Sequence, residues 1–257
     1  MFELFLAEFR RSWIQFTRYS TEAIGGIIII TAVFYGLFLS ARYIAGPGLQ
    51  FGNRLDAIIV GYVLWTLVVF IMSDIAGTIQ IEAQTGTLEQ IFLSPFSAPT
   101  VFLVRALANL MLQLLILLSI LLIIITLTRS QLSFPPSLLL PLLTVLLGAY
   151  GLAFTMGSLA LLLKRVQQLF GIFQFALLSL LTVPTETWTG PVRVLGLLLP
   201  MMPGAGLLRD LMARGQMLNP IQFAIALCNG AAYFTLGLFL FRWAERETKR
   251  QGRLGGY

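Results

Sequence analysis

The chain has 257 residues, of which 58% are hydrophobic and 11% are charged, and its mean hydropathy is +0.88. Soluble domains are about 45–50% apolar and about 25% charged. The composition therefore excludes a soluble globular protein and indicates an integral membrane protein, with room for one compact helical bundle and no large soluble domain. The formal net charge of +6 is interpreted as membrane topology and lipid contact, and no nucleic-acid partner is expected.

Residues 1–20 are predicted to form an amphipathic helix lying in the cytoplasmic interface. Apolar side chains recur there at helical spacing and form a stripe about 100° wide, which is the width of an apolar helix face. The stripe consists of Phe2, Phe5, Leu6, Phe9, Trp13 and Phe16. An alternative takes Ile24–Ala41 as a signal-peptide core, but a signal has a short basic leader and not a long amphipathic one.

Residues 21–243 are predicted to form a membrane domain of six transmembrane helices, which makes the fold class all-α. Only helices or closed barrels satisfy the backbone in lipid, and these apolar runs lack the alternation of barrel strands. Each run is near or above the roughly 20 residues that cross a bilayer, although the fifth is short. The predicted spans are Gly25–Tyr43, Ala57–Ile81, Val101–Leu127, Leu138–Leu163, Val166–Val183 and Ile221–Trp243.

Basic residues predict the orientation of this bundle. With both termini in the cytoplasm, eleven Lys and Arg residues fall on the inner side and six on the outer side. The positive-inside rule favours that arrangement. It places the segment after the second span, and the basic tail of residues 244–257, in the cytoplasm.

The polar segment 82–94 between the second and third spans is predicted to contain a short helix of its own. Gly86 permits a sharp turn, and the sequence from Thr87 to Gln90 fits a capping box. Leu88, Ile91 and Phe92 then fall on one narrow apolar face. A membrane protein that builds such a helix between two spans is expected to present it to a partner.

Two further features fall within or next to the spans. Asp74, inside the second span, is expected either to gate the inner mouth or meet a cationic substrate, or to pair with Arg105 or Arg18. Residues 184–215 are rich in proline and are predicted to form re-entrant outer helices, with a structured outer loop as the alternative.

Small residues in two spans predict close helix packing within the subunit. The fourth span has a ridge of Ala149, Ala153 and Gly157, and the sixth has Ala226 and Gly230.

Catalytic chemistry is sparse in this sequence. There is no histidine, Cys228 is the only cysteine, and neither Lys164 nor Lys249 sits in a P-loop sequence. The acids form no D-x-x-D cluster inside a span, which leaves a carboxylate-only Mg²⁺ site as the basis of a minor enzyme hypothesis. No catalytic residue, metal ligand or cofactor is assigned to this chain.

The chain resembles the permease subunits of type-2 ATP-binding-cassette exporters over nearly its whole length. The most specific match is Glu82, then Gly86-Thr87-Leu88-Glu89, then Ser94-Pro95, which is similar to the coupling-helix signature of that family. A weaker match runs from Leu199-Pro200 through Pro203 to Leu208-Arg209. The sequence departs from the family at Ala83, where many relatives have a basic residue.

The resemblance implies that the segment 82–94 docks into a groove on a separate ATPase subunit, which would bind ATP and Mg²⁺. The implied interface residues are Glu82, Thr85, Gly86, Thr87, Leu88, Glu89, Ile91 and Phe92. A second permease subunit, identical or homologous, and membrane lipids are the other expected partners. Side chains on the second and fifth spans are candidates for a substrate path between two permeases: Trp65, Thr66, Val69, Ser73, Phe170, Phe173, Gln174 and Leu177.

The function expected from this resemblance is ATP-driven export of a drug-like molecule or lipid across a bacterial inner membrane. A polysaccharide or glycolipid exporter is the closest alternative, because sugars also stack on aromatic rings. A scaffold or channel without transport activity is the other alternative.

Overall fold

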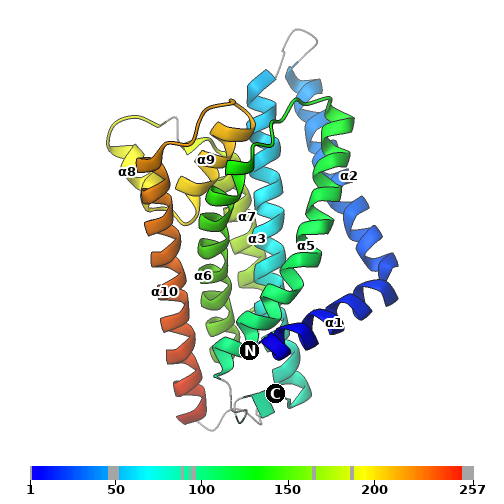
Figure 1. Cartoon of the computed structure of the whole chain (residues 1–257), viewed down its shortest axis with the longest axis vertical. Helices are drawn as coiled ribbons and strands as arrows, with labels where there is room; N and C mark the ends of the chain where they lie inside the picture. The colour runs from blue at the N-terminus through cyan, green and yellow to red at the C-terminus, as the bar shows by residue number, and fades with distance from the viewer. Residues whose placement is uncertain are drawn as a thin grey trace.

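The structure is a computed structural model that describes residues 2–45, 52–87, 90–91, 93, 97–163, 166–185 and 188–250. Long helices run side by side, and α1 lies across one end of them (Figure 1). The helices are α1 (Phe2–Arg18), α2 (Ser20–Ala45), α3 (Gly52–Thr85), α5 (Ala98–Thr128), η1 (Pro136–Leu138), α6 (Leu139–Leu163), α7 (Gln167–Thr182), α8 (Pro191–Leu198), α9 (Met202–Met212) and α10 (Pro220–Arg250).

The expected all-α membrane class is confirmed. Within the described residues, five helices are long and apolar enough to cross a membrane, or six if the bent pair α8 and α9 is counted as one span. They match the predicted spans except the fifth, for which α7 has only 16 residues. Helix α3 continues past the predicted end of its span to Thr85, and α10 continues to Arg250, into the predicted tail.

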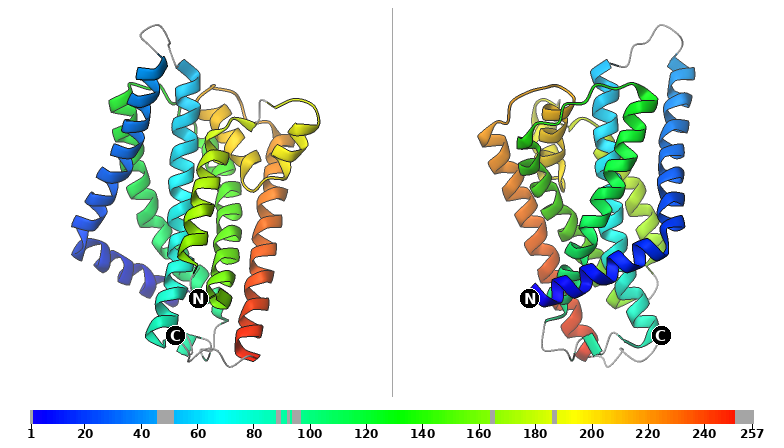
Figure 2. Two further views of the ribbon diagram at one scale, coloured as in Figure 1. Left: turned by 180° about the vertical axis from the view of Figure 1, so that it is seen from behind. Right: turned by 45° about the vertical axis from the view of Figure 1, so that its right-hand side comes forward.

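We call the two ends of the bundle the α1 end and the α9 end. α1 crosses the lower part of the bundle at a steep angle to the long helices (Figure 2). The expected helix over residues 1–20 is therefore present as α1. Its aromatic rings stack in sequence from Phe5 through Phe9 and Trp13 to Phe16, while Leu6 and Trp13 stay about half exposed.

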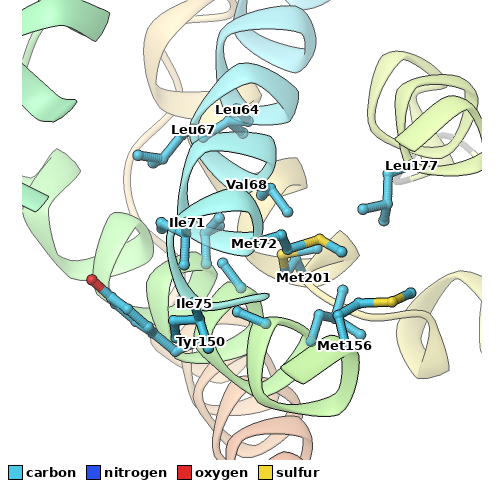
Figure 3. Close-up of a cluster of buried hydrophobic side chains, with 14 of the residues drawn as sticks. Leu64, Leu67, Val68, Ile71, Met72, Ile75, Tyr150, Met156, Leu177 and Met201 are labelled. Atoms are coloured by element: carbon cyan, nitrogen blue, oxygen red, sulfur yellow. The ribbon is translucent and has the colours of Figure 1, made fainter. Parts of the chain in front are cut away.

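Helix α3 lies at the centre of the bundle and contacts α5, α6, α7 and α9. In its most apolar stretch 67% of the residues are buried, against 11% in α2. Figure 3 shows side chains of α3, including Met72, facing Met156 of α6, Leu177 of α7 and Met201. Because lipid is as apolar as these side chains, close packing and not exclusion of water favours their association.

Helices α6 and α10 pack with their backbones in contact. A Cβ atom on Gly151 would meet the carbonyl of Tyr233, and one on Gly237 would meet the carbonyl of Gly151. Of the expected small-residue ridges, Gly230 takes part as well, since a Cβ there would meet the carbonyl of Thr144. Ala149, Ala153 and Ala226 are buried, and a Cβ on Gly157 would meet Ile75 and Ile79 of α3 and Phe241 of α10. Gly151 and Gly237 are the additional close-approach positions that the predicted ridges did not include.

The break between α8 and α9 is held by side chains of α10. The two helices meet at 99°, and Met201 has a positive φ of 63°. The Asn229 amide donates to the carbonyls of Leu197 and Leu199, at 2.9 and 3.1 Å, and its Oδ1 accepts the Met201 N–H. The Tyr233 hydroxyl donates to Leu198 O at 2.8 Å. Backbone groups freed by the break are therefore satisfied, as an apolar environment requires.

Helix α9 also contributes a buried cation at this end of the bundle. Arg209 is fully buried, and its guanidinium donates to the carbonyl of Leu181 near the end of α7. Residues 184–215, for which re-entrant outer helices were predicted, contain the two short helices α8 and α9.

Gly237→Ala is predicted to lower the thermal unfolding temperature of the protein in detergent. The added methyl group meets a backbone carbonyl that cannot rotate away, and overpacking of this kind costs about 1–3 kcal/mol. Gly36→Ala in α2 is the matched control, because a Cβ there meets nothing within 4 Å. Equal unfolding temperatures for the two variants would contradict the close α6–α10 contact.

Candidate functional site

Arg105 connects three helices at the α1 end of the bundle. Its Nε donates to Glu8 Oε1 of α1 at 3.4 Å, and one terminal nitrogen donates to Glu82 Oε1 of α3 at 2.9 Å. The side chains of all three residues are only 13–16% exposed. One guanidinium on α5 therefore bridges two carboxylates and holds the middle of α1 against the last turn of α3.

A second polar layer lies one turn further along α5. The Asn109 amide donates to Asp74 Oδ1 of α3 at 2.7 Å, and the Ser12 hydroxyl of α1 donates to Asn109 Oδ1. α1 thus meets the bundle through Glu8 and Ser12, at the edge of its aromatic stripe, and this packing leaves Leu6 and Trp13 exposed.

The expected direct ion pair of Asp74 with Arg105 or Arg18 is not formed among the described residues. Helices α3 and α5 run in opposite directions, so Glu82 lies level with Arg105 and Asp74 lies level with Asn109. Two turns of helix separate Asp74 from Glu82, roughly 12 Å along the axis. The amide of Asn109 takes the place that the prediction gave to a cation.

The two polar layers line a cavity of about 430 Å³ between α1, α3 and α5. Glu8 Oε2 and Gln113 Oε1 are buried atoms without a hydrogen-bond partner in the described part of the chain, and both residues line this cavity. Buried polar atoms of this kind bind ordered water where space allows. Asp74 therefore faces a polar, water-accessible space.

The turn that ends α3 is tied to the same network. Gly86 has φ +74°, a conformation that glycine adopts without steric cost, and Thr87 N–H returns to the carbonyl of Glu82 at 3.0 Å. The Thr87 hydroxyl donates to Glu82 Oε2. Both carboxylate oxygens of Glu82 are thus used, one on Arg105 and one on the turn.

The capping box expected at Thr87 is wrong in its details. Gln90 N–H donates to the carbonyl of Thr87 at 3.1 Å and not to its hydroxyl. That hydroxyl instead donates to Glu82 and lies 2.9 Å from Thr85 Oγ1. Gln90 and Ile91 are helical, so a helix does begin near the predicted place.

The apolar face predicted for this segment is described only in part. Ile91 packs against the buried core of the bundle, whereas Leu93 is 85% exposed. Leu88, Glu89 and Phe92 lie outside the described residues, as do Ser94 and Pro95. Of the described apolar side chains in the segment, Leu93 is therefore the one available to a partner.

Two of the substrate-path candidates, Trp65 and Gln174, meet where α3 packs on α7. Trp65 Nε1 donates to the carbonyl of Gln174 at 2.9 Å, and Phe170 and Phe173 pack against the core. The structure buries Thr66 and Leu177, and the Thr66 hydroxyl donates back to Tyr62 O in its own helix. Val69 is half-buried and Ser73 is exposed.

Several residues of the network were missed by the sequence reasoning or given another role. Glu8, Ser12 and Asn109 were not singled out, and Arg105 was considered only as a partner for Asp74. A usable signal is present, since Glu8 and Ser12 are four residues apart, as are Arg105 and Asn109, which places each pair on one helix face.

No group of three or more His, Cys, Asp or Glu side chains within the described ranges is placed to hold a metal ion. No known family profile matches this chain, and no characterised protein matches its sequence.

Arg105→Gln is predicted to loosen α1 from the bundle and to lower the unfolding temperature by several degrees. The change leaves Glu8 and Glu82 without their shared cation, and hydrogen bonds to charged groups are worth about 1.5–3 kcal/mol each. Loosening is measured as slower disulfide formation between cysteines placed at Ser12 and Asn109 in a Cys228→Ala background.

Arg11→Gln is the control for this prediction. Arg11 approaches the same Glu8 carboxylate at 3.7 Å, but its side chain is 61% exposed, and exposed ion pairs contribute little. Equal effects of the two substitutions on cross-linking would show that Arg105 does not hold α1.

Proposed function

We propose that this chain is the permease subunit of an ATP-driven exporter of the type-2 ATP-binding-cassette class, with ATP and Mg²⁺ bound by a separate ATPase subunit. The observation that supports the proposal most directly is the double use of Glu82. This residue begins the family-like motif, and its carboxylate joins the turn at Gly86 to Arg105 of α5. A segment after α3 that is anchored in this way moves together with α1, α3 and α5, as a coupling element has to.

The proposal includes a membrane orientation. The α1 end faces the cytoplasm of a bacterial cell, and α8 and α9 form a re-entrant segment on the outer side. Support comes from the eleven-to-six distribution of basic residues and from α1, whose partly exposed aromatic stripe suits the membrane interface.

A second permease subunit is proposed to cover α2 and α7. Both helices lie at the margin of the bundle and expose large apolar side chains. Examples are Ile28, Ile29 and Leu37 on α2, and Ile172 and Phe175 on α7. Substrate would pass between the two permeases near these helices, whose apolar surface suits an amphipathic cargo.

The orientation predicts opposite accessibility for two exposed positions, Leu93 at 85% and Met217 at 96%. In a Cys228→Ala background, Met217→Cys is expected to react in intact cells with a thiol reagent that does not cross membranes. Leu93→Cys is expected to react only after the cells are permeabilised. Labelling of position 93 from outside would reverse the topology and remove the basis for an ATPase contact.

Leu93→Asp is predicted to weaken binding of the ATPase subunit while the permease still inserts and folds. Burial of a leucine side chain contributes about 1.5–3 kcal/mol, so its loss weakens association roughly tenfold to a hundredfold. The measurement is copurification of the ATPase together with stimulated ATP hydrolysis.

Gln90→Asp supplies the matched control, because it places the same charge at an exposed polar position in the same segment. Its effect is expected to be small. Full ATPase binding and transport by Leu93→Asp would exclude this segment as the docking element.

A further inference from the structure

Two adjoining cavities lie against α3 near the α9 end of the bundle. The first, about 450 Å³, is bounded by α2, α3 and α7 and is mostly apolar; its lining includes Phe34, Leu37, Ile58, Tyr62 and Leu178. The second, about 600 Å³, lies beyond it. Ile58 and Thr182 line both, so the two form one groove, which we call the α2–α7 groove.

Two arginines mark the outer part of the α2–α7 groove. Arg54 and Arg214 line the second cavity, and no acidic side chain among the described residues lines either cavity. Arg214 pairs with Asp210, whereas Arg54 is exposed and forms no ion pair within the described part of the chain. Asp56, the nearest acid along α3, is buried and does not line the groove.

This arrangement combines an apolar channel with cationic groups at one end. The groove opens sideways, since Leu37 and Ile58 on its walls are 56% and 40% exposed. A small molecule without charge would use only the apolar part, and a free anion would use only the arginines. A molecule with an apolar chain and an anionic head complements both.

We propose that the α2–α7 groove binds a membrane lipid with an anionic headgroup, its acyl chain lying between α2 and α7 and its phosphate facing Arg54 and Arg214. Both cavity volumes fall within the roughly 300–1,000 Å³ of sites for small molecules. A second copy of this chain is the competing occupant. In an isologous pair the second copy would bring its own Arg54 and Arg214 to the same level of the membrane as those of the first copy. The positive charges of the two copies would repel each other, and an anionic lipid between the copies would reduce this repulsion.

The lipid site deepens the proposed function, because a lipid bound there would be the cargo of the exporter. Only this identification of the lipid as cargo rests on the proposed function. Binding is measured on the isolated chain without an ATPase. Failure of lipid binding would therefore leave the ATPase assignment standing, and failure of the ATPase assignment would leave the lipid site standing.

The test is quenching of Trp65 fluorescence by lipids with dibrominated acyl chains. Trp65 reports on the groove, because its ring lies 5.3 Å from that of Tyr62, which lines the groove. To make Trp65 the single tryptophan of the chain, Phe replaces Trp13, Trp188 and Trp243. Dibrominated phosphatidylglycerol is compared with dibrominated phosphatidylcholine in mixed micelles. We expect phosphatidylglycerol to bind more tightly, by roughly fivefold, given about 1 kcal/mol per basic residue near an anionic surface. Only Arg54 is counted at this full value, because Arg214 is already paired with Asp210.

Variants separate the two parts of the groove. Arg54→Gln together with Arg214→Gln is expected to abolish the preference for phosphatidylglycerol, whereas Arg129→Gln, an exposed arginine at the same end that does not line the groove, keeps it. Ser179→Trp fills the apolar part of the groove from an exposed position and is expected to reduce quenching of Trp65 by both lipids. The fluorescence of the added Trp is measured separately in a Ser179→Trp, Trp65→Phe variant and subtracted.

Three results would overturn the proposal. The first is an unchanged preference for phosphatidylglycerol in the double arginine variant. The second is displacement of dibrominated phosphatidylglycerol by glycerol 3-phosphate alone, which would mean that the acyl chain is not bound. The third is quenching that disappears as the chains dimerise, which would make a second copy the occupant of the groove.

Discussion

The position of Arg105 between Glu8 and Glu82 is the constraint on which the α1 end of the bundle depends. Three charged side chains close to the membrane are costly unless each is paired, and a single guanidinium contacts both carboxylates. The pairing fixes the axial registry of the antiparallel helices α3 and α5, and this registry places Asn109 next to Asp74. It also determines which face of α1 meets the bundle, because Glu8 and Ser12 lie on that face. Phe5, Phe9 and Phe16 lie beside them and are half-buried, whereas Trp13 is exposed.

At the α9 end the constraint is a broken helix in an apolar setting. The break between α8 and α9 frees several backbone groups, and Asn229 and Tyr233 of α10 satisfy them. Those two residues reach the break because α10 packs closely on α6 through Gly151 and Gly237. The glycine contacts therefore do more than bring two helices together, since they position the side chains that make an interrupted backbone tolerable in lipid.

Features with a strong local signal were predictable from the sequence, and features that depend on opposed helices were not. Apolar length gave the long helices, and amphipathic spacing gave α1. The partner of Asp74 could not be deduced, because it depends on the registry between α3 and α5, which no local pattern encodes. The role of Thr87 was mistaken for the same reason: its hydroxyl is drawn to Glu82, a contact that exists only once the chain has turned at Gly86.

Helix α3 belongs to both ends of the molecule. Its last turns contribute Glu82 to the ionic network, and its first turns contribute Arg54, Ile58 and Tyr62 to the α2–α7 groove. A helix of 34 residues is roughly 50 Å long and is packed along its middle by α6 and α7. Since packed helices move as rigid bodies more readily than they bend, a displacement at Glu82 would be transmitted along α3 to Tyr62. The proposed partner at one end and the proposed lipid at the other would then be coupled through this one helix.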